Sequence, residues 1–192
     1  MNLKRRLSVL ALILAAAAFA GCGRGMRPTK FTNSDYNFAY LERVAILPLL
    51  NMSEDRQAGS RATRILITEL LASEAVDVVE PGETRAALNR ITSGDPTPTT
   101  EQIIALGKAL NVQAVLQGSV AQSGSSMAGT VMIPVVTLDV HMLETESGQV
   151  IWAATHTEKG SSAGAAILGT GSEPISQTTR RCARRIIKTL VN

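Results

Sequence analysis

The chain has 192 residues, a formal charge of +3, a sequence pI near 9.1 and only 3% aromatic residues. The excess of positive charge comes from three basic residues near the N-terminus, Lys4, Arg5 and Arg6. From residue 22 onward the chain has 16 basic and 16 acidic residues and is therefore neutral overall. A neutral chain so poor in aromatic rings lacks the positive surface and the base-stacking platforms of nucleic-acid-binding proteins, and its length suits one domain.

The first 21 residues are typical of a lipoprotein signal peptide. The three basic residues are followed by an apolar run from Leu7 to Ala20, interrupted only by Ser8. This run of about 14 residues suits a signal sequence and is shorter than the roughly 20 residues of a spanning helix. It ends in Gly21-Cys22, and lipoprotein signal peptidases require small residues before the cysteine. We therefore predict a signal peptide over residues 1–21 and lipid attachment at Cys22; the alternatives are a secretory signal cut elsewhere and an uncleaved anchor.

Lipid on Cys22 would place the mature chain at a membrane. Each buried methylene contributes about 0.8 kcal/mol, so the two or three acyl chains of a lipoprotein, such as palmitate, anchor it firmly. Gly23 stands where an aspartate commonly retains lipoproteins in the inner membrane, which favours the periplasmic face of the outer membrane. Cys182 is then alone in an oxidising compartment; we expect a buried thiol, with an intermolecular disulfide or a reactive nucleophile as alternatives.

Behind the cysteine, residues 22–40 are polar and mixed, and we predict a tether that becomes ordered near Tyr36. Residues 41–192 are expected to form a single domain. The apolar run 43–50 is typical of a strand buried on both faces. After a loop over 51–55, a helix should run to about Ser73, capped by Ser53 or the acidic residues near it, with Arg64 and Glu69 facing outward. A short strand is expected over 76–80 and a short helix over 83–91.

In the second half of the chain, we expect a helix, three strands and a final helix. A helix capped by Thr99 or Thr100 leads into a strand over 112–120, and the Gly/Ser-rich stretch 122–130 is expected to be a mobile loop. Alternation from Val136 predicts a half-buried antiparallel strand that turns at Gly148 into 149–155, with either Ile151 or Trp152 facing the core. A second glycine-rich loop, 159–173, precedes a helix over 175–191.

This order, β-α-β-α-α-β-β-β-α, predicts an α/β fold with a mixed β-sheet and helices packed on it. The sequence contains few residues in patterns typical of an active site or a metal site. His141 and His156 are its only histidines, and no Cys/His cluster has the spacing of a zinc site. Asp139 shares a strand face with His141, which suggests a surface hydrogen bond or, alternatively, a catalytic pair. We predict no catalytic residue, no metal site and no cofactor.

Two further features each allow two interpretations. Five basic residues lie between Arg180 and Lys188 on the last helix, either as a solvated face or as a contact for anionic lipid or an acidic partner. The loop 51–55 follows the carboxyl end of the first strand, where open α/β sheets commonly bind ligands. Helix capping explains the residues of this loop equally well.

Together with the lipoprotein signal, several short motifs resemble a superfamily of envelope lipoproteins. The motifs are the runs 44–49 and 51–53, 78–81, 106–112, 115–119, 138–140 and 148–152. The superfamily includes the curli secretion channel subunit, the lipoprotein activators of penicillin-binding proteins, and the amino-terminal domain of the Tol system's periplasmic protein. The resemblance covers residues 43–191. It implies a non-enzymatic scaffold or accessory subunit in cell-envelope assembly or secretion, with an envelope protein partner or self-assembly.

Three hypotheses follow. The first is an outer-membrane lipoprotein that assembles with itself or with partners; a pore is not expected, because membrane hairpins need alternating strands of about 9–11 residues, which 122–130 and 159–173 do not supply. The second is an activator of peptidoglycan synthesis that binds a penicillin-binding protein, although such activators carry a longer tether. The third is an enzyme such as a hydrolase, against which the polar residues argue.

Overall fold

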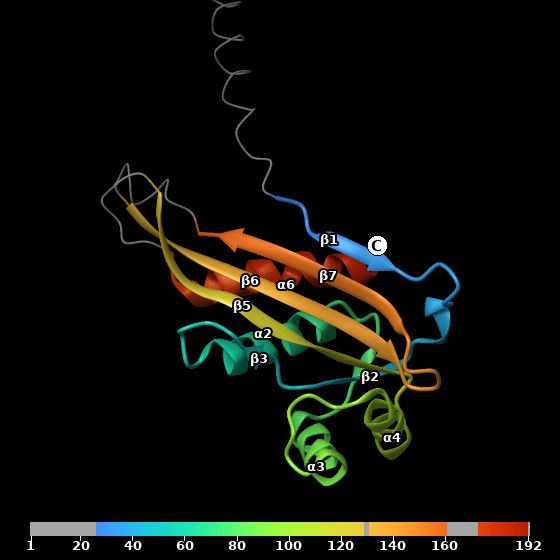
Figure 1. Ribbon diagram of the computed structural model, residues 1–192. Coiled ribbons are helices and arrows are strands. Elements are labelled where there is room, and N and C mark those ends of the chain that lie inside the picture. The colour runs from blue at the N-terminus through green and yellow to red at the C-terminus, as the bar shows by residue number, and fades with distance from the viewer. Residues whose placement is uncertain (1–25, 129–130, 161–172, 192) are drawn as a thin grey trace, which may run out of the picture.

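The computed structural model describes residues 26–128, 131–160 and 173–191. The predicted signal peptide and Cys22 lie outside these ranges. A seven-stranded mixed sheet runs through the molecule in the order β1-β7-β6-β5-β2-β4, with β3 paired to β5 (Figure 1). Helices pack on this sheet, so the predicted fold class is confirmed.

Three long antiparallel strands form the centre of the sheet: β5 (Ala114–Ala128), β6 (Val131–Glu144) and β7 (Val150–Lys159). On one side, β2 (Arg43–Ile46) and β3 (Leu50–Asn51) run parallel to β5, and β4 (Asp77–Val78) runs parallel to β2. The parallel strands are short, and the antiparallel hairpins carry most of the pairing.

The opposite edge is β1 (Thr29–Thr32), which pairs antiparallel with β7 and places Thr29 opposite Thr155. These residues fall within the predicted tether 22–40, and the sheet therefore begins earlier than residue 41. All four side chains are exposed, so no hydrophobic pattern marks the strand. The main chain of β1 holds it in place by pairing with the free edge of β7.

The helices divide between the two faces of the sheet (Figure 1). On one face, α2 (Ala58–Leu71) and α6 (Ile175–Val191) contact each other, and α6 crosses β6 and β7. On the other, α3 (Pro81–Thr92) and α4 (Thr100–Leu110) cover β2 and the start of β5; a 3-10 turn, η1 (Phe38–Tyr40), precedes β2. Each pair of helices encloses its own hydrophobic core.

Local sequence explains most helix ends. Thr99 and Gln102 form a reciprocal capping box at α4, and Pro81 occupies the first turn of α3, where its missing N–H costs nothing. The helix expected after loop 51–55 is confirmed, but the cap expected from Ser53 or the nearby acids is wrong. The helix begins at Ala58 without a side-chain cap, because residues 53–57 form a turn in which Asp55 accepts from the backbone N–H of Gln57.

The predicted mobile loop 122–130 is also wrong for its described residues. Strand pairing continues from Gln122 opposite Thr137 to Ala128 opposite Val131, after a β-bulge between Val120 and Gln122. A strand ladder uses main-chain N–H and C=O groups, so small residues on β5 pair as long as β6 supplies the matching groups. Residues 129 and 130 lie outside the described residues.

A second bulge decides which residue of β7 faces the core. Met142 lies opposite Trp152 and Leu143 opposite Val150, so Ile151 is the extra residue on β7. Both Ile151 and Trp152 are buried in the core beneath α2 and α6. The alternation predicted from sequence left one of them outside, and the bulge allows both to be inside.

Candidate functional site

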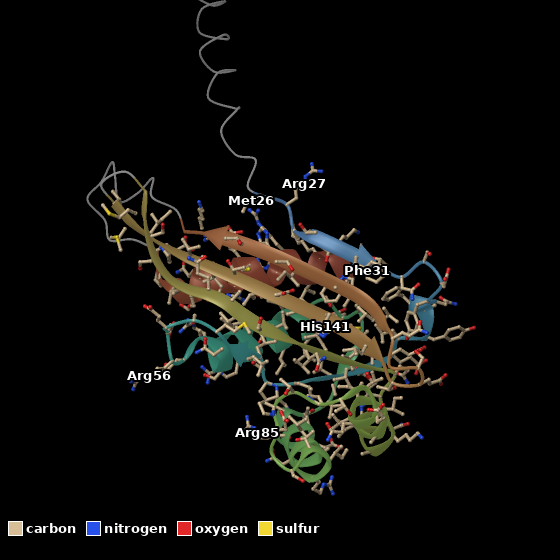
Figure 2. All side chains as sticks on the ribbon, in the orientation of Figure 1. Met26, Arg27, Phe31, Arg56, Arg85 and His141 are labelled. Atoms are coloured by element: carbon tan, nitrogen blue, oxygen red, sulfur yellow. The ribbon has the colours of Figure 1, made fainter. Side chains whose placement is uncertain are left out.

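Part of the sheet is left uncovered by the helices that the structure describes. This open sheet face lies opposite α2 and α6 and beyond α3 and α4, and Figure 2 labels Phe31 and His141 on it. The strand register sets two rows of neighbouring side chains across β1, β7, β6 and β5. They are Phe31, Ala153, His141 and Gln117 in one row, and Thr29, Thr155, Asp139 and Ser119 in the other.

His141 and Asp139 share this face, as predicted, but each bonds to a different partner. The Nε2 atom of His141 lies 2.9 Å from Nε2 of Gln117, and the hydroxyl of Thr155 donates to Asp139 Oδ1 over 2.9 Å. An amide nitrogen only donates, so His141 Nε2 accepts and the ring proton sits on Nδ1. Burial lowers the pKa of His141 below its ordinary value, against the opposing effect of Asp139. The imidazole is therefore neutral at pH 7.

A cavity of about 220 Å³ opens beside His141 at the carboxyl end of β2. Its walls combine apolar and polar side chains from four separate segments of the chain: Leu47, Leu50, Met52, Pro96, Pro98, Gln117, Asp139 and His141. One of the two interpretations of loop 51–55 was a ligand site at this end of the sheet, but the sequence could not show that residues 96–98 and 139–141 complete the wall.

The polar side chains of loop 51–55 form hydrogen bonds within the loop and with residues of α2 and β5. The Asn51 side-chain oxygen accepts from the backbone and hydroxyl of Ser53, and its amide donates to the Asp55 carbonyl. The Asp55 carboxylate pairs with Arg61 of α2 and accepts from the Ser123 hydroxyl. These residues therefore bond within the loop and to its neighbours rather than cap α2, and only Met52 of the loop lines the cavity.

The arginines of α6 bind two buried carboxylates. Glu158, only 7% exposed, lies 3.1 Å from Arg181 Nε, 3.2 Å from Arg185 Nε and 3.0 Å from Nε2 of the buried His156. Arg181 also pairs with Glu173. On the side of α2, Glu69 lies 2.9 Å from Arg180 Nε and 2.8 Å from Arg184 Nε.

These pairs revise two expectations. Glu69 was predicted to face outward, yet it is only 6% exposed, because α2 packs against α6 and turns Glu69 toward the arginines. The arginines of the basic cluster are not a plain solvated face either, since four of them compensate carboxylates within the molecule. The alternative, a contact for anionic lipid, loses most of the positive charge on which it depended.

The ion pairs of Glu69 with Arg180 and Arg184 should make the stability of the fold depend on pH in the acidic range. Burial alone would raise the pKa of Glu69, but hydrogen bonds from Arg184 and Arg180 outweigh it and bring the pKa below its ordinary 4.5. A lowered pKa in the folded state means that the carboxylate stabilises the fold above about pH 4.5 and that this contribution is lost as the pH falls further. We expect Glu69→Gln to cost about 1–2 kcal/mol at pH 7 and much less at pH 3.

Urea titrations at pH 7, 5 and 3 measure this difference. Glu54→Gln is the control, because Glu54 is an exposed glutamate that forms no ion pair among the described residues. It should follow the wild type at every pH. A constant gap between Glu69→Gln and the wild type from pH 7 to pH 3 would contradict the linkage.

Cys182 is a buried structural thiol, as predicted. Its side chain is fully buried in α6, and its Sγ lies 3.3 Å from the carbonyl oxygen of His156. Burial raises its pKa to about 12, so the thiol stays protonated at neutral pH and is a poor nucleophile. This excludes the reactive-nucleophile alternative for the folded chain.

Within the described ranges, no group of three or more His, Cys, Asp or Glu side chains is arranged to hold a metal ion. No helix in those ranges combines the length and the apolar character needed to cross a membrane. The two buried carboxylates in these ranges, Glu69 and Glu158, are instead paired with arginine and histidine side chains.

Comparison with known proteins relates this fold to solved structures. No family model matches the sequence, and no curated protein matches it. A PelC dodecamer from Paraburkholderia phytofirmans matches with 19% identity and a TM-score of 0.57, over 85% of this chain and 96% of that chain. Lipoprotein GNA1162 from Neisseria meningitidis matches with 14% identity and a TM-score of 0.54, over 79% and 99%.

The LpoB C-terminal domain from Salmonella enterica also matches, with 15% identity and a TM-score of 0.46 over 61% of this chain and 82% of that chain. Membership with the curli-channel and Tol proteins stays a prediction. At identities this low, likeness extends to the fold and not to function. The chain has the fold of PelC and of lipoprotein GNA1162 over nearly the whole length of both.

Proposed function

We propose that this chain is an envelope lipoprotein, held at the periplasmic face of the outer membrane through fatty acids on Cys22, that works as a non-enzymatic accessory subunit and assembles with copies of itself. The observation that carries the proposal is the fold match to a PelC dodecamer over 96% of that chain. The match to lipoprotein GNA1162, together with the signal sequence and Cys22, supports the anchor.

The short connection between the anchor and the sheet supports a role at the membrane. Cys22 precedes β1 by seven residues, which span at most about 25 Å when fully extended. A domain held this close suits a subunit that works beside the bilayer. The same distance counts against an activator of peptidoglycan synthesis, which must reach a penicillin-binding protein across the wall.

The open sheet face supports a binding role. Its rows of small polar and apolar side chains, with Phe31 51% exposed at the edge, form a broad surface that no described helix covers. His141 and Asp139 are each bonded to a neighbour rather than to each other. This arrangement suits contact with another protein better than proton transfer.

Removing the acylated cysteine should release the protein from the membrane. In cells fed a clickable fatty acid, the wild type should be labelled and should sediment with membranes, whereas Cys22→Ala should be unlabelled and soluble, because every acyl chain is attached to this one cysteine residue. Cys182→Ala is the matched control and should keep the label, since that thiol is buried. A labelled Cys22→Ala protein, or an unlabelled wild type, would contradict the anchor.

Self-assembly requires a separate measurement. Native mass spectrometry of the lipoprotein extracted in detergent should give a high-order oligomer, and crosslinking in intact cells should join copies of this chain. A monomer crosslinked mainly to a penicillin-binding protein would favour the activator of peptidoglycan synthesis instead. Turnover in a broad hydrolase screen that His141→Ala abolished would overturn the non-enzymatic role.

A further inference from the structure

The β5–β6 hairpin projects beyond the rest of the sheet. Strand β7 ends at Lys159, opposite Val135, whereas β6 extends back to Val131 and β5 forward to Ala128. No other described strand flanks this projecting part (Figure 1). We call residues 125–127 and 131–133 the hairpin tip.

The hairpin tip exposes two large apolar side chains. Met127 and Met132 lie opposite each other in the register and are 71% and 51% exposed. The sequence contains no charged residue between Lys108 and Asp139. Projecting strands in water normally carry charges that keep them from associating, and this pair carries none. Because its two strands pair with each other, the tip can leave water without stranding the main-chain groups that the ladder joins.

The anchor lies at the same end of the molecule. The Met26 carbonyl accepts from Arg185, whose side chain also lies 3.2 Å from Glu158, and Glu158 is opposite Val136. The chain at Met26 is therefore close to the level of Val136 along the sheet. Figure 2 shows Met26 at the end of the sheet toward which the hairpin projects, and its side chain is 61% exposed.

The span from Val136 to the hairpin tip and the greatest span from Met26 to Cys22 are nearly equal. From Val136, β6 continues four residues to Met132, about 13 Å at 3.3 Å per residue. Cys22 precedes Met26 by four residues, which span at most about 14 Å. A lipidated Cys22 can therefore lie level with the methionine pair, and the hairpin tip can then reach the bilayer that holds the acyl chains.

We propose that the hairpin tip enters the headgroup region of this bilayer and forms a second membrane contact beside the lipid anchor. The inference rests on the anchor of the proposed function. Interfacial segments commonly sink about 5–10 Å into the boundary between headgroups and acyl chains, a depth that Met127 and Met132 can reach together. Two contacts fix the orientation of the domain on the membrane, which an acyl chain alone does not.

Site-specific fluorescence tests the contact. The full acylated protein carries Met127→Cys, Met132→Cys or Tyr40→Cys, labelled with the fluorophore NBD; Cys182 is buried and does not compete for the label. Tyr40 is the matched control, because it is 72% exposed and its neighbours Gln113 and Glu144 lie at the far end of β5 and β6. Each protein is reconstituted into vesicles of phosphatidylethanolamine and phosphatidylglycerol with doxyl-labelled acyl chains.

We expect the probes at 127 and 132 to shift to the blue and to be quenched several-fold more strongly than the probe at 40. Quenching no greater than at 40, in protein that floats with the vesicles, would overturn the inference and leave the anchor intact. A blue shift without doxyl quenching would place the tip against another protein copy and would also overturn it. Protein that neither floats nor incorporates fatty acid would overturn the anchor and the inference together.

Discussion

Alanine in place of Gly118 is expected to lower the free energy of unfolding by about 3 kcal/mol or more. An added Cβ would lie 2.8 Å from the Cα of Val140, and the carbonyl oxygen of Asp139 would be closer still. Both atoms belong to the backbone of β6, which pairs with β5 on one side and β7 on the other. Neither atom can withdraw without breaking the ladder at the centre of the sheet, so a single methyl group should disrupt it.

Gly124→Ala is the matched control on the same strand. A Cβ at Gly124 would meet no atom within 4 Å, so alanine there should leave stability unchanged or raise it by up to about 1 kcal/mol through reduced backbone freedom in the unfolded chain. Urea unfolding followed by the fluorescence of Trp152, the only tryptophan in the sequence, measures both variants. Equal midpoints for the two variants would show that β5 and β6 are farther apart at Gly118 than in this structure.

Sequence predicts best the elements that depend on neighbouring residues. The last helix was expected over 175–191, and α6 covers Ile175–Val191, because its apolar stripe repeats at helical spacing. Thr99, one of the two residues expected to cap α4, is the cap, since a capping box requires only a threonine and a glutamine three residues apart. In both cases the signal and the structure lie within one short segment.

Elements that depend on pairing with distant main chain were missed. The tip of β5 is rich in glycine and serine, and β1 has four exposed residues, so neither segment shows a hydrophobic pattern. Their partners on β6 and β7 satisfy the backbone hydrogen bonds, and these bonds leave no trace in side-chain composition. The projecting hairpin, and with it the proposed membrane contact, therefore became visible only in the structure.

The buried ion pairs were missed for a related reason. Glu69 lies on a different helix from Arg180 and Arg184, and helical spacing alone did not mark it as buried. Glu158 alternates into the core from β7, where a carboxylate is stable only because Arg181, Arg185 and His156 meet it. Such compensation depends on tertiary packing, so the sequence showed only a run of arginines on one helix.

Replacing Trp152 with alanine is expected to cost about 3–5 kcal/mol of unfolding free energy. The side chain is fully buried in the core beneath α2 and α6, and Met142 lies opposite it across the bulge in β7. Removing the ring leaves a cavity that the surrounding strands cannot close, because the bulge fixes Ile151 on the same side. Far-UV circular dichroism in urea should follow the unfolding, since this variant has no tryptophan fluorescence.

Two further variants separate the contributions to this loss. Trp152→Phe should keep a large part of the stability, because the buried indole Nε1 has no hydrogen-bond partner in the described structure and phenylalanine gives up ring volume without losing such a bond. Val150→Ala, at a position 39% exposed, should cost less than about 1 kcal/mol. If Val150→Ala were instead as damaging as Trp152→Ala, β7 would be shifted by one residue against β6, and the rows of side chains on the open sheet face would have to be reassigned.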